Sequence, residues 1–180
     1  MFTIVILVRV MTKISKLNKL FIKRPRNNLG VVDLFSGCGG LSLGFDMAGY
    51  NIKAMIDFDN DSLLTAEKNG LAEHYLNLDL FEEDWIKDFT SKVKLNEVDI
   101  IIAGPPCQGF SLTGPRNLDD KRNKLYKSVF ELVKKAKPKA FLIENVKGMA
   151  TLYNGQVKDC LLYTFPSPRD RTRSRMPSSA

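Results

Sequence analysis

The chain has 180 residues, enough for one domain with a substantial core, and its 44% hydrophobic and 26% charged residues are typical of a soluble globular protein. The net charge of +7 comes from the two ends, because residues 30–159 carry 16 basic and 19 acidic side chains. The basic balance is therefore weak support for nucleic-acid binding by the folded part. The three cysteines form no C-x-x-C pair, which argues against a disulfide framework and a zinc site, and we expect no metal.

Residues 1–29 hold seven Lys/Arg and no acid, and we expect a flexible basic extension there, with ordered structure beginning at Gly30. The apolar segment 1–10 is interrupted by Arg9 and is too short to span a bilayer. It also lacks the features of a signal peptide. Two interpretations of the extension stay open: an arm that touches phosphate, or a solvated or translated upstream sequence with Met11 as the true start.

The first predicted unit is a strand over 31–35, a glycine loop over 36–40 and a helix over 41–49. This strand–loop–helix order is typical of nucleotide-binding α/β folds, in which glycines let a ligand approach the backbone closely. The spacing is not G-x-G-x-x-G, which lowers the odds of a dinucleotide-dependent oxidoreductase.

A second strand over 52–56 ends at Asp57, which lies 20 residues after Gly37. An acid in this position can accept hydrogen bonds from ribose hydroxyls, and Phe58 can pack on an adenine face. The alternative for Asp57 is a cap for the next helix, over 61–69, although Asp59 or Asn60 suits that role better.

A weak third strand over 74–78 precedes Asp79, for which a solvated loop acid is a serious alternative. The segment 82–93 then spaces Trp85, Phe89 and Val93 along one helical face, which predicts core packing.

A fourth strand over 100–103 is stopped by Gly104 and two prolines, which cannot continue a sheet ladder. Cys107 follows, just past the carboxyl end of the strand, where open α/β sheets bind ligands. On local grounds it is either a nucleophile or a structural cysteine. A helix with a buried stripe from Leu125 to Ala136 comes next, and Pro138 ends it.

The fifth predicted strand, 140–143, ends at Glu144. A carboxylate at the end of a buried strand is costly unless it is paired or functional, and a salt-bridged structural glutamate is the alternative. Parallel strands place their carboxyl ends at one edge of a sheet, so the residues that follow the five strands should converge there. These residues are Phe35, Asp57, Asp79, Cys107 and Glu144.

Five stretches, in order along the chain, resemble motifs of the cytosine-C5 DNA methyltransferase family. They are D-L-F-S-G-C-G-G-L-S-L-G-F from Asp33, D-F-D from Asp57, Asp79-Leu80, G-P-P-C-Q-G-F-S from Gly104, and E-N-V from Glu144. The resemblance covers roughly residues 30–152. It implies an α/β fold of the Rossmann-like S-adenosylmethionine-dependent methyltransferase type, a parallel sheet with helices on both faces, incomplete at about five strands.

The resemblance also implies roles for individual residues. The catalytic pair would be Cys107, attacking cytosine C6, and Glu144, holding N3 of the base. The S-adenosylmethionine site would comprise Phe35, Ser36, Gly37, Gly39, Gly40, Asp57, Phe58, Asp79, Leu80 and Pro106. Substrate contacts would come from Ser111, Arg122, Asn145 and Val146. The partner of the complete protein would be double-stranded DNA.

The resemblance ends near Tyr153, and residues 160–180 look like a non-native, disordered tail rich in Pro, Ser and Arg. We therefore interpret 30–159 as a partial catalytic domain without its target-recognition half, and we expect the fragment itself to be inactive. The alternatives are a tRNA cytosine-C5 methyltransferase and a non-catalytic remnant that binds only the cofactor. We further expect a cytoplasmic or nucleoid-associated monomer without membrane contact, with a restriction endonuclease as a genetic partner.

Overall fold

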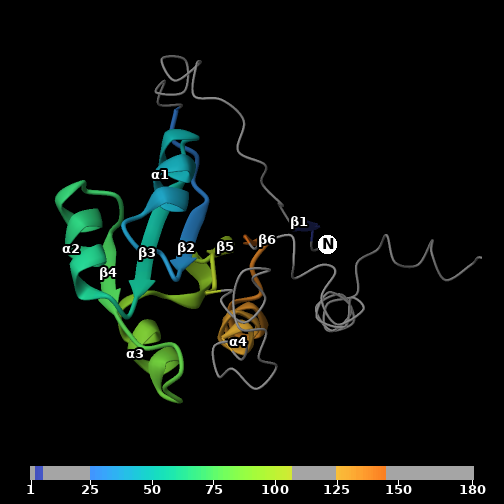
Figure 1. The fold of residues 1–180 in the computed structure, drawn as a ribbon. Coiled ribbons are helices and arrows are strands. Elements are labelled where there is room, and N and C mark those ends of the chain that lie inside the picture. The colour runs from blue at the N-terminus through green and yellow to red at the C-terminus, as the bar shows by residue number, and fades with distance from the viewer. Residues whose placement is uncertain (1–2, 6–24, 107–124, 145–180) are drawn as a thin grey trace, which may run out of the picture.

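The computed structural model describes residues 3–5, 25–106 and 125–144, which form a parallel sheet with helices on both faces (Figure 1). The strands are β1 (Thr3–Val5), β2 (Gly30–Leu34), β3 (Asn51–Asp57), β4 (His74–Asn77), β5 (Ile100–Ala103) and β6 (Ala140–Ile143). The helices are α1 (Gly40–Met47), α2 (Asn60–Lys68), α3 (Trp85–Lys92) and α4 (Tyr126–Ala136), with a 3₁₀ turn, η2 (Leu95–Glu97), before β5.

The strand order is β1-β6-β5-β2-β3-β4, and every neighbouring pair is parallel. From β2 the chain winds outward to β3 and β4, then returns to the other side of β2 to form β5 and β6. The direction of winding therefore changes between β2 and β5. In open α/β sheets, ligands bind at such a switch point, beyond the carboxyl ends of the strands. The predicted fold class and its five strands are confirmed.

Successive side chains of the buried strands point to opposite faces of the sheet, so the core has two layers. Val31 of β2 faces the layer formed with α1 and α2, whereas Val32 faces the layer formed with α3 and α4. Trp85, Phe89 and Val93 are at most 2% exposed in the second layer, as their helical spacing predicts. Both faces of the sheet are covered, which is why its strands consist mostly of apolar residues.

The first 29 residues contain more structure than the sequence predicts. Thr3–Val5 forms β1, which pairs parallel to the start of β6. Arg26 forms an ion pair of 2.6 Å with Asp46 of α1 and also donates to the carbonyl of Tyr50. The N–H of Asn27 donates to the carbonyl of Gly49 over 2.7 Å. Ordered structure therefore begins before Gly30, because the residues leading into β2 pack against the end of α1.

Asp99, which precedes β5, connects the strands at the amino-terminal edge of the sheet. Its carboxylate accepts a hydrogen bond from the N–H of Gly30 over 2.9 Å and pairs with the ammonium of Lys139 over 2.7 Å. Burial alone would raise the pKa of Asp99, but the bonds from Lys139 and Gly30 outweigh it and lower the pKa. One side chain thus joins the starts of β2, β5 and β6.

None of the helices that the structure describes is long and apolar enough to cross a membrane. The longest, α4, has 11 residues, whereas a bilayer span needs about 20.

Candidate cofactor and active site

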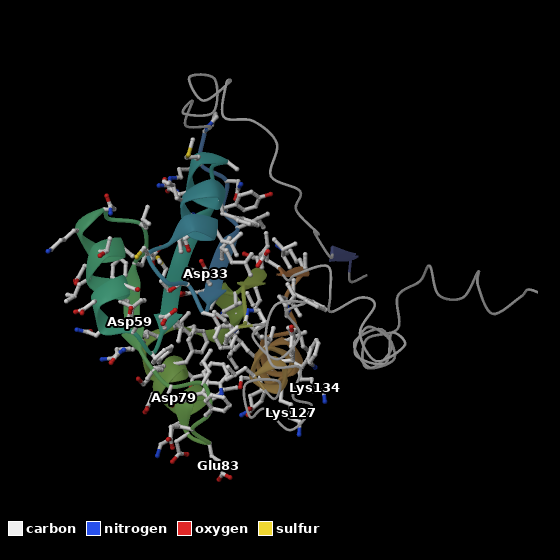
Figure 2. All side chains as sticks on the ribbon, viewed as in Figure 1. Asp33, Asp59, Asp79, Glu83, Lys127 and Lys134 are labelled. Carbon is white, nitrogen blue, oxygen red and sulfur yellow. The ribbon has the colours of Figure 1, made fainter. Side chains whose placement is uncertain are left out.

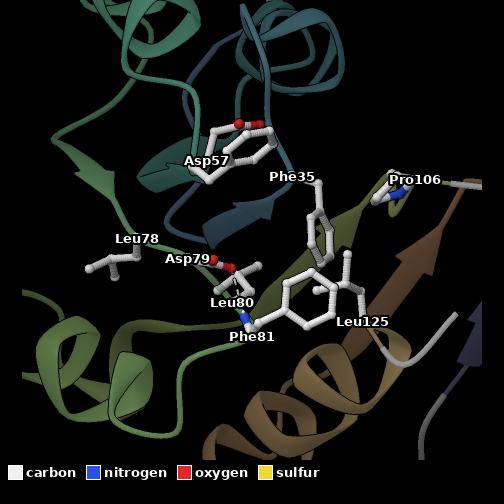
Figure 3. A pocket seen from close by; sticks show the side chains of 10 residues that line it. Phe35, Asp57, Leu78, Asp79, Leu80, Phe81, Pro106 and Leu125 are labelled. Atoms are coloured by element: carbon white, nitrogen blue, oxygen red, sulfur yellow. Dashed lines mark hydrogen bonds between the residues drawn. The ribbon is translucent and has the colours of Figure 1, made fainter. Parts of the chain in front are cut away.

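A cavity of about 450 Å³ opens at the carboxyl-terminal edge of the sheet (Figure 3). Segments that follow β2, β3, β4 and β5 line it together with the start of α4. The lining residues are Phe35, Asp57, Phe58, Leu78, Asp79, Leu80, Phe81, Gly104, Pro106 and Leu125. Its size falls within the usual range of small-molecule sites, and its position is the switch point between β2 and β5.

A sharp turn after β2 brings Phe35 to this cavity. Phe35 has a φ of 60°, a left-handed conformation that a residue with a side chain adopts only at a cost of about 1–2 kcal/mol. Gly37 and Gly39 continue the turn with φ values of 51° and 92°. A Cβ at Gly39 would lie 2.5 Å from Cδ1 of Leu71, so the end of that side chain would have to shift. The loop therefore favours glycine there mainly for its conformation.

Asp57 holds the glycine loop against the end of β3. Its Oδ2 accepts a hydrogen bond from the N–H of Gly37 over 2.7 Å, and its Oδ1 accepts one from the N–H of Asp59 over 2.9 Å. Asp59 occupies the N-cap of α2, but its carboxylate accepts from the hydroxyl of Ser62 and bonds no helix N–H. Ribose binding and helix capping are the two roles that the sequence suggests for Asp57; the structure adds a third role, bridging the loop to the strand.

A tight turn after β4 arranges Asp79, Leu80 and Phe81. Oδ1 of Asp79 accepts a hydrogen bond from the N–H of Phe81 over 2.9 Å. Leu80 is 5% exposed and joins the core, and its carbonyl accepts a bond of 2.6 Å from the hydroxyl of Ser128 on α4. Asp79 is exposed, so its carboxylate is available to a ligand in the cavity.

Glu144 lies at the end of β6, next to the end of β5. Its N–H donates to the carbonyl of Ala103 over 2.8 Å, and its Oε2 lies 3.9 Å from the position that a Cβ on Gly104 would take. The carboxylate is partly buried. Glu144 thus lies beside the first residue of the Gly-Pro-Pro-Cys segment. Five residues predicted to be functional lie outside the described part of the chain: Cys107, Ser111, Arg122, Asn145 and Val146.

The predicted cofactor residues fall into two groups. Those that line the cavity are Phe35, Asp57, Phe58, Asp79, Leu80 and Pro106. Those outside its lining, in and beside the glycine loop, are Ser36, Gly37, Gly39 and Gly40. Sequence reasoning missed Leu78, Phe81, Gly104 and Leu125 as lining residues. Proximity to a strand end was a signal for three of them, whereas Leu125 reaches the cavity only because α4 packs beside Leu80.

A buried carboxyl group lies behind the glycine loop. Asp33 of β2 is fully buried, and its Oδ2 accepts a bond of 2.7 Å from the hydroxyl of Ser42 on α1. Its Oδ1 has no hydrogen-bond partner. Burial raises the pKa of Asp33 to about 7, against the smaller lowering by Ser42. The sequence analysis placed this residue within a strand and assigned it no role.

Figure 2 shows the labelled acids Asp59, Asp79 and Glu83 on the side of α2 and α3, and Lys127 and Lys134 on α4. The part of the chain that the structure describes contains no group of three or more His, Cys, Asp or Glu side chains placed to hold a metal ion.

Comparison with known proteins identifies the family. The model of the C-5 cytosine-specific DNA methylase family matches residues 29–167. The chain belongs to this family. It is 39% identical over 140 residues to the type II methyltransferase M.NgoPII of Neisseria gonorrhoeae. That alignment covers 75% of this chain and 38% of M.NgoPII. The chain is 36% identical over 171 residues to M.BsuRI of Bacillus subtilis, covering 83% and 39% respectively.

A solved structure supports the same family assignment. A prophage-encoded protein of E. coli, assigned as a DNA modification methyltransferase, superposes with a TM-score of 0.61 and 35% identity, over 76% of this chain and 37% of that one. The Dnmt2 methyltransferase of S. pombe shares the fold, with a TM-score of 0.53 at 22% identity. The fold is thus an incomplete methyltransferase fold. The chain spans 28% to 44% of the curated relatives it matches.

Proposed function

We propose that the complete protein is a DNA cytosine-C5 methyltransferase that uses S-adenosylmethionine, and that this chain carries its cofactor site and catalytic pair. The observation that carries the proposal is the carboxyl edge of the sheet. There a cavity lined by aromatic rings and two acids adjoins the strand end that leads to Cys107, with Glu144 beside it.

The cavity suits an adenosine-containing cofactor. Phe35, Phe58 and Pro106 offer apolar faces to a purine ring, while Asp57 and Asp79 offer acceptors for ribose hydroxyls and an exocyclic amine. Gly37 and Gly39 keep the loop behind Phe35 free of bulk, and its backbone adjoins the start of α1. S-adenosylmethionine, when bound, would supply an electrophilic methyl group.

Cytosine C5 is a poor nucleophile until C6 is attacked. In the proposed reaction the thiolate of Cys107 forms a bond to C6, and the displaced electron pair moves toward N3. Glu144 in its protonated form donates to N3 and neutralises the developing charge. C5 would then bond the methyl group, and the bonding pair would stay on the sulfur of the departing S-adenosylhomocysteine. Loss of the C5 proton restores the C5–C6 double bond and expels the thiolate of Cys107.

The target base cannot be reached within a duplex, so it must be flipped into the site. We propose that Ser111, Arg122, Asn145 and Val146 contact the flipped cytosine or its strand. The substrate of the complete protein would be double-stranded DNA. A restriction endonuclease as genetic partner, a monomeric state and a cytoplasmic location complete the proposal.

Covalent trapping tests the nucleophile directly. Fluorine at C5 cannot be lost as a cation, so the restored full-length enzyme should stay attached to DNA that contains 5-fluorocytosine, and only with cofactor present. Cys107→Ala should abolish both trapping and methyl transfer. Cys38→Ala is the control, because Cys38 is an exposed thiol in the glycine loop and should leave trapping intact. Trapping that survives in Cys107→Ala would overturn the proposed nucleophile.

A further inference from the structure

Phe81 is an aromatic residue in the cavity to which neither the motifs nor the proposed mechanism gives a role. It follows Leu80 in the turn after β4, and its ring is 47% exposed although it belongs to the cavity lining. Figure 3 shows Phe81 among the residues that line the cavity, together with Phe35 and Leu125. A half-exposed phenylalanine beside other apolar groups leaves area for a ligand to cover.

The turn fixes Phe81 relative to an acceptor. Its own N–H donates to Oδ1 of Asp79 over 2.9 Å, and the carbonyl of Asp79 accepts from the N–H of Glu82 over 3.1 Å. Leu80, between them, is anchored in the core. One small hydrogen-bonded turn therefore holds the carboxylate of Asp79 and the backbone of Phe81, from which the ring extends to the cavity.

This pairing of an acceptor with an aromatic face matches one chemical class of ligand. A purine bearing an exocyclic amine has a flat apolar face and a donor at its edge, so one ring system can contact both groups. We propose that Phe81 is a purine-contacting residue of the cavity and determines affinity for the adenine part of the cofactor. The inference rests on the proposed function for the nature of the ligand.

The test is the affinity of the 180-residue chain for S-adenosylhomocysteine, measured by calorimetry. Phe81→Ala removes the whole ring and should weaken binding roughly 10-fold, because a half-exposed Phe offers substantial apolar area to a ligand. Phe81→Leu keeps part of that area and should fall between Phe81→Ala and the wild type. Leu64→Ala is the matched control: Leu64 is 42% exposed on α2 and lies outside the cavity lining, so its loss should leave affinity unchanged.

Competition by adenosine tests whether Phe81 contacts the adenosine part of the ligand. Adenosine lacks the amino-acid part, so Phe81→Ala should weaken it by the same factor as S-adenosylhomocysteine. Trp85, the single tryptophan, is 2% exposed in the core, and its fluorescence confirms that each variant is folded. Equal affinity of Phe81→Ala and wild type, or a loss confined to S-adenosylhomocysteine, would overturn the inference and leave the proposed function standing. Absence of binding by the folded wild type would overturn the inference together with the proposal that this chain carries the cofactor site.

Discussion

The acidic side chains at the two edges of the sheet differ in their ion pairing. At the amino-terminal edge, acids are paired: Asp99 with Lys139 over 2.7 Å, and Glu73 with Lys53 over 2.7 Å. At the carboxyl-terminal edge, Asp57, Asp79 and Glu144 form no ion pair with any described residue. Carboxylates without a cation partner remain able to accept hydrogen bonds from a ligand, as we propose for this edge, whereas the ion pairs at the other edge contribute to stability.

The carboxyl edge should carry the largest effect on activity. In the restored full-length enzyme, Glu144→Gln should lower kcat roughly 10²–10⁴-fold, because an amide has no acidic proton to give to N3 of the base. Methyl transfer measured under single-turnover conditions checks this. Glu73→Gln is the matched control at the amino edge and should leave kcat unchanged. A normal kcat in Glu144→Gln would remove the reason for calling this edge catalytic.

The amino edge should carry the largest effect on stability. A Cβ at Gly30 would lie 2.0 Å from the carbonyl oxygen of Glu97, and a backbone atom cannot move aside as easily as the end of a side chain. Gly30→Ala should therefore lower the free energy of unfolding by about 3 kcal/mol or more, measured by denaturant titration of Trp85 fluorescence.

Gly44→Ala is the control for that substitution. Gly44 lies within α1, and a Cβ there would meet nothing within 4 Å. Since alanine favours helix over glycine, Gly44→Ala should raise stability by about 0.5–1 kcal/mol. Equal losses in the two variants would contradict the tight closure of the amino edge.

The raised pKa of Asp33 predicts how the stability of the folded chain depends on pH. Its pKa of about 7 in the folded chain exceeds the ordinary value of 3.8, so the folded state binds more protons between these pH values. Stability should therefore fall as pH rises from about 4 to 7, by up to about 1.4 kcal/mol per pH unit, and stay flat above that range. Asp33→Asn should remove the decline, as measured by urea unfolding at several pH values. Asp61→Asn, at an exposed site on α2, should keep it; parallel curves for wild type and Asp33→Asn would refute the assignment.

Asp99→Asn should have the smallest effect. The pair with Lys139 is partly solvent-exposed, 69% on the lysine side, so screening limits the loss to about 1 kcal/mol. Because the pKa of Asp99 is lowered, this contribution should be present near neutral pH and vanish as pH falls through the folded pKa. Glu131→Gln, which removes an exposed pair of 3.4 Å on α4, should cost less. If the two variants lost equal stability, Asp99 would not fasten the edge.

Local patterning in the sequence determined most of the fold. Ile100–Ala103 and Ala140–Ile143 form strands at their predicted bounds, since short β-branched and apolar runs ended by proline or polar residues have few other stable placements. The order of strands and helices also determined that the residues after each strand meet at one edge. Those predictions needed only the period of the pattern and the rules of parallel sheets.

The hydrogen-bond partner of each polar group depends on how distant segments meet in the folded chain. Asp57 bonds the N–H of Gly37, 20 residues away, and Asp99 bonds Gly30, 69 residues away. Asp33 lies within an apolar strand, yet its raised pKa depends on α1 covering it. Leu125 reaches the cavity because α4 packs beside Leu80. Hydrogen bonding and burial depend on distances in space, which the sequence sets only through the folded chain, and for that reason the strand ends were predictable and their contacts were not.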